Sequence, residues 1–180
     1  MTFSQVSDGY YIFSPVISFP EEDQVYQTVL MDTSSIIFHE WVHSKATAST
    51  AYLLSDSTLL RPCKIDPPIF DGGGAGGLIQ LISWYNEIIW EYEMVSIEES
   101  QHHDIEPLVN GNILVISWER KSQEEAMAAG KVSHTGDLWS EKVIEIQPIY
   151  PDSALIIWEW HLWDHLIQDY DENIDNYGTV

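Results

Sequence analysis

Positively charged residues are scarce in this 180-residue sequence, which holds 7 Lys and Arg against 29 Asp and Glu. The formal net charge of −22 creates a field that repels phosphates and anionic lipid head groups. No nucleic-acid partner and no membrane partner is therefore predicted. The simplest interpretation of the charge is a well-solvated acidic surface.

Cysteine and long apolar runs are also nearly absent. Cys63 is the single cysteine, so an intrachain disulfide is excluded and cysteine content does not decide the redox compartment. No run of about 18 apolar residues is present, which argues against a transmembrane helix. The first eight residues lack both a basic region and an apolar run, so no signal peptide is predicted.

Aromatic residues are plentiful, with 8 Trp and 9 Tyr, and they point to a sheet-rich globular fold. The best-defined hairpin is predicted over residues 102–121, where two apolar segments flank Asn110-Gly111. That dipeptide tolerates positive φ and favours a tight primed turn. Titratable groups of both signs should then gather at the open end of this hairpin.

A second pattern repeats along the chain. Three further predicted hairpins end in an aromatic residue or His, then Glu, then an aromatic residue, namely His39-Glu40-Trp41, Trp90-Glu91-Tyr92 and Trp158-Glu159-Trp160. Hairpins of another type alternate with them. Two hairpins in about 50 residues are typical of a β-propeller blade. The sequence therefore predicts an all-β fold, a β-propeller segment of about two and a half four-stranded blades.

Two segments interrupt this pattern within what we treat as a single partial propeller domain over residues 1–180. Residues 122–131 are rich in Ala and Glu and stop at Gly130, which predicts one short inserted helix. Residues 164–180 are acidic and show no strand pattern, so they are predicted to form a tail or loop. Because a propeller needs at least four blades, the rest of the ring is expected from further blades or from another chain.

Taken together, these motifs resemble the bacterial arylsulfotransferase family, in its branch of six-bladed propellers. The resemblance is carried by HHDIEPLVNGNILVISWERK with the following EEAMAAGK, by GGGAGGLIQLISWYNEIIWEYE, and by IIWEWHLWDHLIQDYD, and it extends over roughly residues 10–178. Two features depart from the family pattern. Tyr85-Asn86 replaces the usual Asn-Gly type of turn, and family members continue into further blades.

The resemblance implies transfer of a sulfuryl group from an aryl sulfate to a phenolic acceptor through a sulfo-histidine intermediate, without a cofactor. It places the nucleophilic histidine on blades outside this chain and implies a periplasmic or secreted location. A neutral imidazole is a competent nucleophile, and hydrogen-bonding or cationic neighbours stabilise charge on the transferring oxygens. The implied partners are aryl sulfates and phenols, with a homo-oligomer if the ring is closed between chains.

Candidate site residues follow from the central hairpin. Adjacent residues on a strand face opposite ways, so His102 and His103 should not both point into one channel. We prefer His103 as a catalytic candidate that directly enters the strand, with Asp104 as a substrate-site residue that orients it. Arg120 is a substrate-binding candidate because its guanidinium can grip sulfate oxygens through two N–H donors. The alternatives are a polar strand cap for His103 and pairing of Arg120 with nearby carboxylates.

Two histidines near the end of the chain are the remaining candidates. His165 is a second catalytic candidate and His161 a substrate-binding one, because both could reach over the mouth of the channel. Their spacing would suit a metal on a helix, but no third ligand is spaced with them, so no metal site is predicted. The alternative is a Trp-rich lid with hydrogen-bonded histidines.

A glycine-rich stretch and a rival function complete the sequence interpretation. Gly72, Gly74 and Gly77 match G-x-G-x-x-G formally, but prolines precede them and a predicted strand follows, which indicates a loop between hairpins rather than a dinucleotide site. The rival function is a non-catalytic β-propeller module that binds a ligand or a partner.

Overall fold

The computed structural model describes residues 9–15, 25–66, 68, 70, 72–133 and 135–179. The first eight residues, in which no signal peptide is predicted, lie outside this part, as do Pro67 and Val180. Among the described residues, no helix is long and apolar enough to cross a bilayer.

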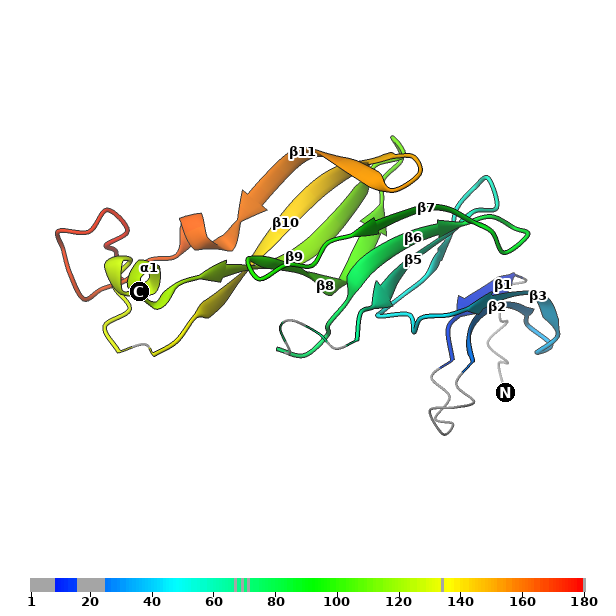
Figure 1. Cartoon of the computed structure of the whole chain (residues 1–180), viewed down its shortest axis with the longest axis horizontal. Helices are drawn as coiled ribbons and strands as arrows, with labels where there is room; N and C mark the ends of the chain where they lie inside the picture. The colour runs from blue at the N-terminus through cyan, green and yellow to red at the C-terminus, as the bar shows by residue number, and fades with distance from the viewer. Residues whose placement is uncertain are drawn as a thin grey trace, which may run out of the picture.

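In the described part of the chain, eleven strands form three successive antiparallel sheets (Figure 1). Sheet 1 contains β1 (Tyr10–Phe13), β2 (Tyr26–Asp32) and β3 (Ile37–His43). Sheet 2 contains β4 (Tyr52–Leu53), β5 (Leu59–Lys64), β6 (Gly77–Ile82) and β7 (Ile88–Glu93). Sheet 3 contains β8 (Glu99–Pro107), β9 (Ile113–Lys121), β10 (Leu138–Ile149) and β11 (Ser153–His161).

Within each sheet the strands lie side by side in chain order. This is the arrangement of propeller blades, so the predicted all-β, partial propeller fold is confirmed. Sheet 1 is larger than the predicted outer half of a blade, because β1 pairs with β2 and adds a third strand.

The repeated triplets occupy equivalent places. Each lies on the last strand of its sheet, directly after one extra residue that shifts the pairing register. These extra residues are Phe38, Ile89 and Ile157. A β-bulge of this kind bends its strand and increases the local twist. The repeat seen in the sequence is thus a repeat of strand geometry.

Four of the hairpin turns share one conformation, which differs from the predicted primed turn. At Asn110-Gly111 the Gly111 N–H donates to Leu108 O at 3.0 Å, and Gly111 has a φ of 86°. Only the glycine has positive φ in this turn, whereas a type I′ turn needs positive φ at both central residues, so that prediction was wrong. A type I turn followed by a left-handed residue also matches strand twist.

The same left-handed position is filled by other residues in the other three turns. Ser35, Ser57 and Asn86 have φ values of 65°, 69° and 67°. Asn is one of the few residues besides Gly that enters this region, because its side chain can hydrogen-bond locally. This explains how Tyr85-Asn86 replaces an Asn-Gly turn without changing the hairpin.

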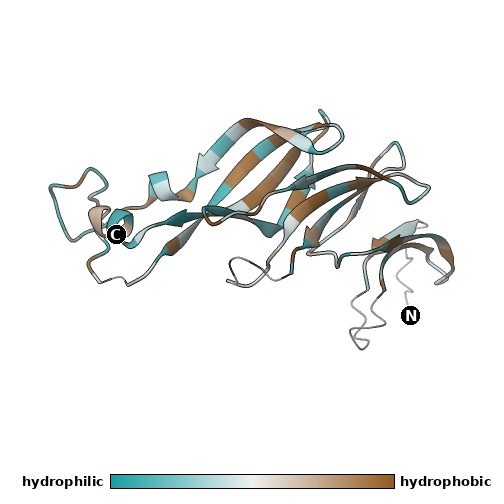
Figure 2. Cartoon of the chain, viewed as in Figure 1, coloured by the Kyte–Doolittle hydropathy of each residue, from teal (hydrophilic) through white to brown (hydrophobic). Residues whose placement is uncertain are grey.

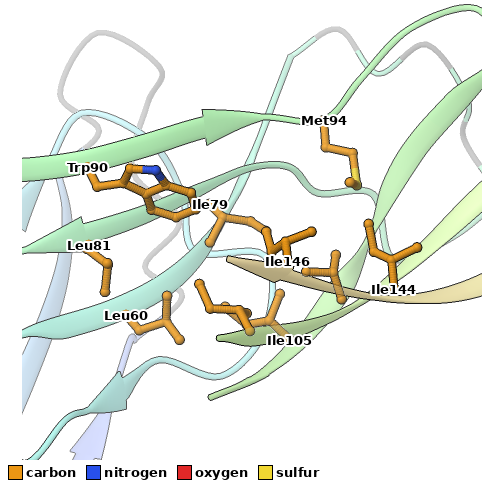
Figure 3. Packing of buried hydrophobic residues seen from close by; sticks show 10 residues of the cluster. Leu60, Ile79, Leu81, Trp90, Met94, Ile105, Ile144 and Ile146 are labelled. Carbon is orange, nitrogen blue, oxygen red and sulfur yellow. The ribbon is translucent and has the colours of Figure 1, made fainter. Parts of the chain in front are cut away.

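Sheet 2 lies between the other two sheets and is buried on both faces. One core cluster joins it to sheet 3 through Leu60, Ile79, Leu81, Trp90, Ile105, Ile113, Val115, Ile144 and Ile146, among others (Figure 3). A second cluster joins it to sheet 1 through Leu30, Trp41, Leu59 and Ile82. Because both faces of β6 are covered, its sequence GLIQLI is nearly continuously apolar rather than alternating.

The predicted inserted helix is α1 (Gln123–Ala128). Ser122 and Glu125 form a reciprocal capping box, and the hydrogen bond from the Ser122 N–H holds the pKa of Glu125 below its usual value. The helix gives way to Gly130 with a φ of 99°, as predicted from the glycine exit.

The acidic segment that follows sheet 3 is an ordered loop. It begins with a short 3-10 helix, η2 (Leu162–His165), and returns to α1, where Asn176 Nδ2 donates to Ala129 O at 2.9 Å. Gln168 closes the loop through its backbone, which donates to Asn176 O. Residues 164–179, part of the segment predicted as an acidic tail or loop, therefore contact α1.

Candidate functional site

His102 and His103 lie on β8, the first strand of sheet 3. Gln101 pairs with Ser117 and Ile105 pairs with Val115, so four steps along β8 match only two along β9. The extra residues break the alternation of side chains. The two imidazole rings consequently lie together, with centroids 4.3 Å apart, and the prediction that they face opposite ways was wrong.

The glycine-rich loop between β5 and β6 packs directly on this histidine pair. Gly74 has a φ of 72°, and a Cβ there would collide with the ring of His103. A Cβ on Gly76 would collide with the amide of Gln101, whose Oε1 accepts the Gly77 N–H at 2.8 Å. The glycines are therefore required by close backbone approach, and the loop covers the pair.

The surroundings of the pair disfavour protonation of His102. Burial, followed by the neighbouring His103, lowers the pKa of His102 below its usual value, and Glu141 at 3.6 Å opposes this shift. The ring of His102 also packs on Trp118 at 4.1 Å. Among the described residues, the Nδ1 atoms of both histidines are buried without a hydrogen-bond partner. In the described part of the chain, the Nδ1 of His103 is therefore a buried polar atom without a partner, whereas the Nδ1 of His102 faces Glu141.

A pocket of about 460 Å³ opens on the other side of Gly74, between sheets 1 and 2. Lys45 and Lys64 line it together with Asp66 and Tyr26. These lysines are two of only 7 basic residues in the chain. The pocket and the histidine pair share Gly74 as a neighbour, while no histidine lines the pocket itself.

A second polar cluster lies in sheet 3, where the face that packs on sheet 2 changes character. Along β9 the inward positions run Ile113, Val115, Ser117, Glu119, so the apolar pattern stops halfway. Figure 2 shows the same change from brown to teal along β9 towards α1. Across the strands, Gln101, Ser117, Lys142 and His161 are paired in one row.

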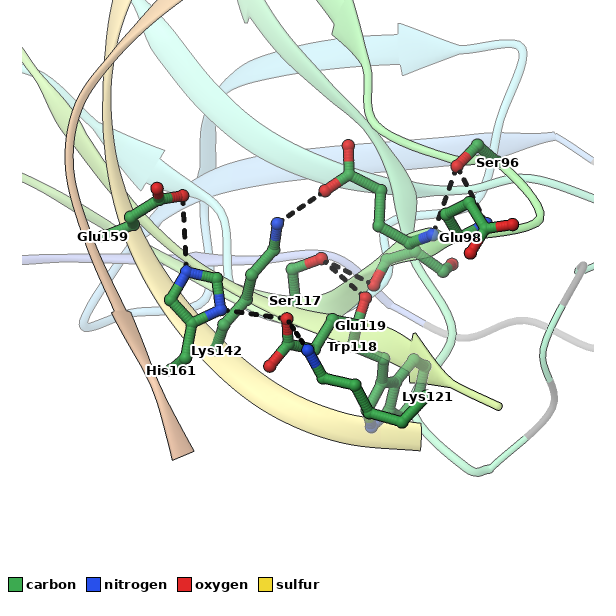
Figure 4. A network of polar contacts seen from close by, with 11 residues as sticks. Ser96, Glu98, Ser117, Trp118, Glu119, Lys121, Lys142, Glu159 and His161 are labelled. Carbon is green, nitrogen blue, oxygen red and sulfur yellow. Dashed lines mark hydrogen bonds and ion pairs between the residues drawn. The ribbon is translucent and has the colours of Figure 1, made fainter. Parts of the chain in front are cut away.

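The charged groups in this cluster form ion pairs and hydrogen bonds with one another (Figure 4). Glu119 Oε2 accepts from His161 Nδ1 at 2.9 Å and lies 3.1 Å from Lys121 Nζ. Lys142 Nζ donates to Glu99 Oε2 at 2.7 Å. Glu119 is only 8% exposed, and its Oε1 has no partner among the described residues. A buried carboxylate oxygen in this state can accept a hydrogen bond from a ligand.

The sequence had not singled out Glu119 as a site residue, nor Lys142, Lys45 or Lys64. The one sequence signal for Glu119 and Lys142 is the break in the alternation of apolar residues along β9 and β10. Lys45 and Lys64 carry no local signal, because a pocket between two sheets is formed by residues distant in sequence.

Arg120 is occupied by carboxylates. Its Nε donates to Asp137 Oδ2 at 2.7 Å and its Nη1 donates to Glu98 Oε1 at 3.0 Å. These contacts, led by the hydrogen bond to Asp137, raise the pKa of Arg120. The sequence left two alternatives for Arg120, namely sulfate binding and pairing with nearby carboxylates. The structure displays pairing with carboxylates, and the partners are not Glu124 and Glu125, which follow Arg120 closely in the sequence.

The other predicted site residues are spread over the sheet. Asp104 accepts a hydrogen bond from Ser49 Oγ at 3.3 Å, and His165 stacks on Trp160 with a centroid distance of 4.8 Å. Since β8 and β11 are the opposite edge strands of sheet 3, three strand spacings or about 14 Å separate them. The structure thus joins His161 to Glu119 but does not bring His103 and His165 together.

Metal and thiol chemistry receive no support from the described part of the chain. No group of three or more His, Cys, Asp or Glu side chains there could hold a metal ion. Cys63 is fully buried, and burial raises the pKa of its thiol to about 11. Such a thiol stays protonated and unreactive at neutral pH.

The chain was compared with protein-family models, with curated proteins and with solved structures. None of the three comparisons found a match. The resemblance to arylsulfotransferases consequently rests on the sequence motifs alone.

Proposed function

We propose that the chain is the substrate-binding part of a sulfuryl transferase of the arylsulfotransferase type, with an aryl sulfate as donor and a phenol as acceptor. The observation that carries this proposal is the pocket lined by Lys45 and Lys64, which meets the histidine pair His102 and His103 at Gly74. Two lysines against the one carboxylate of Asp66 make this recess positive in a chain of net charge −22, which favours an anionic ligand.

Each group has a definite task in this proposal. The ammonium groups of Lys45 and Lys64 attract the monoanionic sulfate ester, and a histidine N–H donates to a sulfuryl oxygen. Tyr26, which lines the pocket, supplies an aromatic neighbour for the ring of the substrate. The nucleophilic histidine is assigned to no residue of this chain, in keeping with the family resemblance.

The transfer itself would proceed in two displacements. An imidazole nitrogen attacks sulfur, the bond from sulfur to the aryl oxygen breaks, and the leaving phenolate takes up a proton. The oxygen of the acceptor phenol then attacks the same sulfur, the N–S bond breaks, and the phenol proton passes to the imidazole or to water. Both steps balance without an oxidant, a metal or a nucleotide.

Binding of 4-nitrophenyl sulfate to the isotope-labelled chain, followed by NMR, tests the proposal. We expect saturable shifts of the His102 and His103 ring signals, and no comparable shifts with 4-nitrophenol, which lacks the sulfate. Lys45→Ala and Lys64→Ala should each weaken binding by roughly tenfold, because each removes one charge from the site. Lys131→Ala makes the same charge change outside the pocket and serves as the matched control.

The outcomes separate the proposal from its rival. Absence of saturable binding, or equal loss of affinity in all three lysine variants, would overturn the proposal. The rival, a module that binds without catalysis, is favoured by the occupation of Arg120 by Glu98 and Asp137. It predicts that 4-nitrophenol release stays at the background rate in the presence of phenol, even in an assembly with a complete ring.

A further inference from the structure

The three sheets present equivalent rows of side chains when they are aligned by their bulges. In each sheet, the first residue of the triplet belongs to a row of residues that pair with one another across the strands, and we call this the forward row. The forward rows are Ile12, Leu30 and His39 in sheet 1, Leu60, Leu81 and Trp90 in sheet 2, and Leu114, Glu145 and Trp158 in sheet 3.

In sheets 1 and 2 the next sheet covers the forward row. Leu60, Leu81 and Trp90 belong to the core cluster shared with sheet 3, and Leu30 belongs to the cluster shared with sheet 2. The last member of each row also bonds to the following outer hairpin. His39 Nε2 lies 2.9 Å from Trp84 O, and Trp90 Nε1 donates to Ser153 O at 2.7 Å.

The forward row of sheet 3 is uncovered in the described structure. Trp158 is 49% exposed, whereas its counterpart Trp90 is fully buried. Trp160 and Leu155 on the same strand are also exposed. Glu145, the one charged member of the row, is turned towards the β8–β9 hairpin, where Asn110 and Asn112 donate to its carboxylate.

Next to each forward row, on the other side of the bulge, lies a second row of cross-strand partners. Its side chains lie on the opposite face of the sheet, and we call it the rear row. The rear rows are Tyr11, Met31 and Ile37 in sheet 1, Leu59, Ile82 and Ile88 in sheet 2, and Ile113, Ile146 and Ile156 in sheet 3. The first two members are buried in sheets 2 and 3, because the preceding sheet packs on them. In sheet 1 both Tyr11 and Ile37 are about half exposed.

We propose that the forward row of sheet 3 docks on the rear row of sheet 1 in a second copy of this chain, and that the reverse contact closes a ring of two copies. The same forward-to-rear contact already occurs twice within one chain, between sheets 1 and 2 and between sheets 2 and 3. A head-to-tail contact of this kind forms a ring when its rotation closes. Two copies supply six sheets, which lies within the range of four to eight blades found in propellers.

The chemistry of the two surfaces favours this partner over another. The indole N–H of Trp90 donates to Ser153 O and His39 contacts Trp84 O, both at the outer hairpin of the next sheet, so the same place in a neighbouring sheet would suit the indole of Trp158. In sheet 1 that turn is the one between β2 and β3, beside Ile37. A symmetric contact between two forward rows would leave both rear rows exposed. This proposal does not depend on sulfuryl transfer, and in a ring closed by two copies a nucleophilic histidine would have to come from this chain rather than from further blades.

Sedimentation velocity on the chain and on two variants tests the ring. We expect the unmodified chain to sediment as a species of twice 20.6 kDa at micromolar concentration. Trp158→Glu and Ile37→Glu should each be monomeric, because each places a charge in both junctions of the ring. Val109→Glu, a fully exposed turn residue outside both rows, should leave the dimer intact.

Mixing the two variants decides between head-to-tail and symmetric association. The Ile37→Glu variant keeps an intact forward row, and the Trp158→Glu variant keeps an intact rear row. These two rows form one unmodified junction in a mixed pair, so an equimolar mixture should recover a dimer that neither variant forms alone. A dimeric Ile37→Glu variant would indicate contact between forward rows and overturn the proposal. A monomeric unmodified chain would overturn it as well. Circular dichroism of each variant establishes that the fold is retained.

Discussion

At the scale of single residues, His43 shows how burial controls protonation. Its imidazole is 8% exposed and Nε2 lies 2.9 Å from Thr28 Oγ1, which in turn lies 2.7 Å from Ser14 Oγ. Burial first, and then the positive charge of Arg61, lower the pKa of His43 to about 3. The folded protein therefore holds a neutral imidazole where the unfolded chain would bind a proton in mild acid.

This difference predicts a loss of stability in acid. Below a pH of about 6.5 His43 is protonated in the unfolded chain, whereas in the folded state it stays neutral until the pH falls to about 3. The unfolded state therefore binds one more proton in this pH range. As a result, His43 should lower the free energy of unfolding by about 3 kcal/mol between pH 7 and pH 4. Urea denaturation at several pH values measures the change. His43→Gln cannot gain a proton, so its stability should depend less on pH, and equal slopes for both proteins would contradict the prediction.

The histidine pair shows where residue-level prediction fails. Alternation along a strand is a sound rule, but the extra residues of β8 between Gln101 and Ile105 cancel it, and no local feature of HHDI reveals them. The partners of Arg120 were also hidden, because Glu98 and Asp137 come close only after β8, β9 and β10 have paired.

At the scale of elements, the sequence predicted well what depends on local pattern. The triplets marked the last strand of each sheet, and SQEEAMAAGK marked a capped helix with a glycine exit. The predicted turn type at Asn110-Gly111 was wrong because this dipeptide is compatible both with a type I′ turn and with a type I turn followed by a left-handed residue. Whether Asn110 takes positive φ depends on which residues pair across the hairpin, and Leu108 pairs with Asn112 there.

The four equivalent turns allow a matched stability test. Ser57 occupies the left-handed position with a φ of 69°, where Gly111 stands in another hairpin with a φ of 86°. Ser57→Gly should raise the free energy of unfolding by about 1 kcal/mol, because a Cβ is unfavourable in this region. Gly111→Ser should lower it by a similar amount.

Thermal or urea denaturation of both variants gives the answer. Ser55→Gly, placed in the same turn at a residue without positive φ, controls for the general effect of glycine on the unfolded chain. Destabilisation by Ser57→Gly as large as that by Ser55→Gly would refute the interpretation of the turn.

At the scale of the whole molecule, charge and apolar surface act in opposite directions. Each copy carries a formal charge of −22, so two copies repel each other, whereas the forward and rear rows attract through apolar contact. Added salt screens the repulsion and leaves the apolar contact in place.

Association should therefore strengthen with ionic strength. We expect the dimer dissociation constant to fall by at least tenfold between about 20 mM and about 300 mM NaCl, because the Debye length shortens severalfold over that range. Sedimentation equilibrium measures it. Trp158→Glu should remain monomeric at both salt concentrations. Dissociation of the dimer on adding salt would show that ion pairs, rather than the apolar rows, hold it together.

The order of strands within each sheet has a consequence for how the chain reaches its fold. Every strand pairs with a strand next to it in sequence, and every sheet packs on the sheet next to it, so no sheet takes a strand from another part of the described chain. The loops that must close before a new strand pairs therefore lie within one sheet rather than across the whole chain. The polypeptide can consequently acquire its structure one sheet at a time, in the order of its synthesis, with each completed sheet serving as the template for the next.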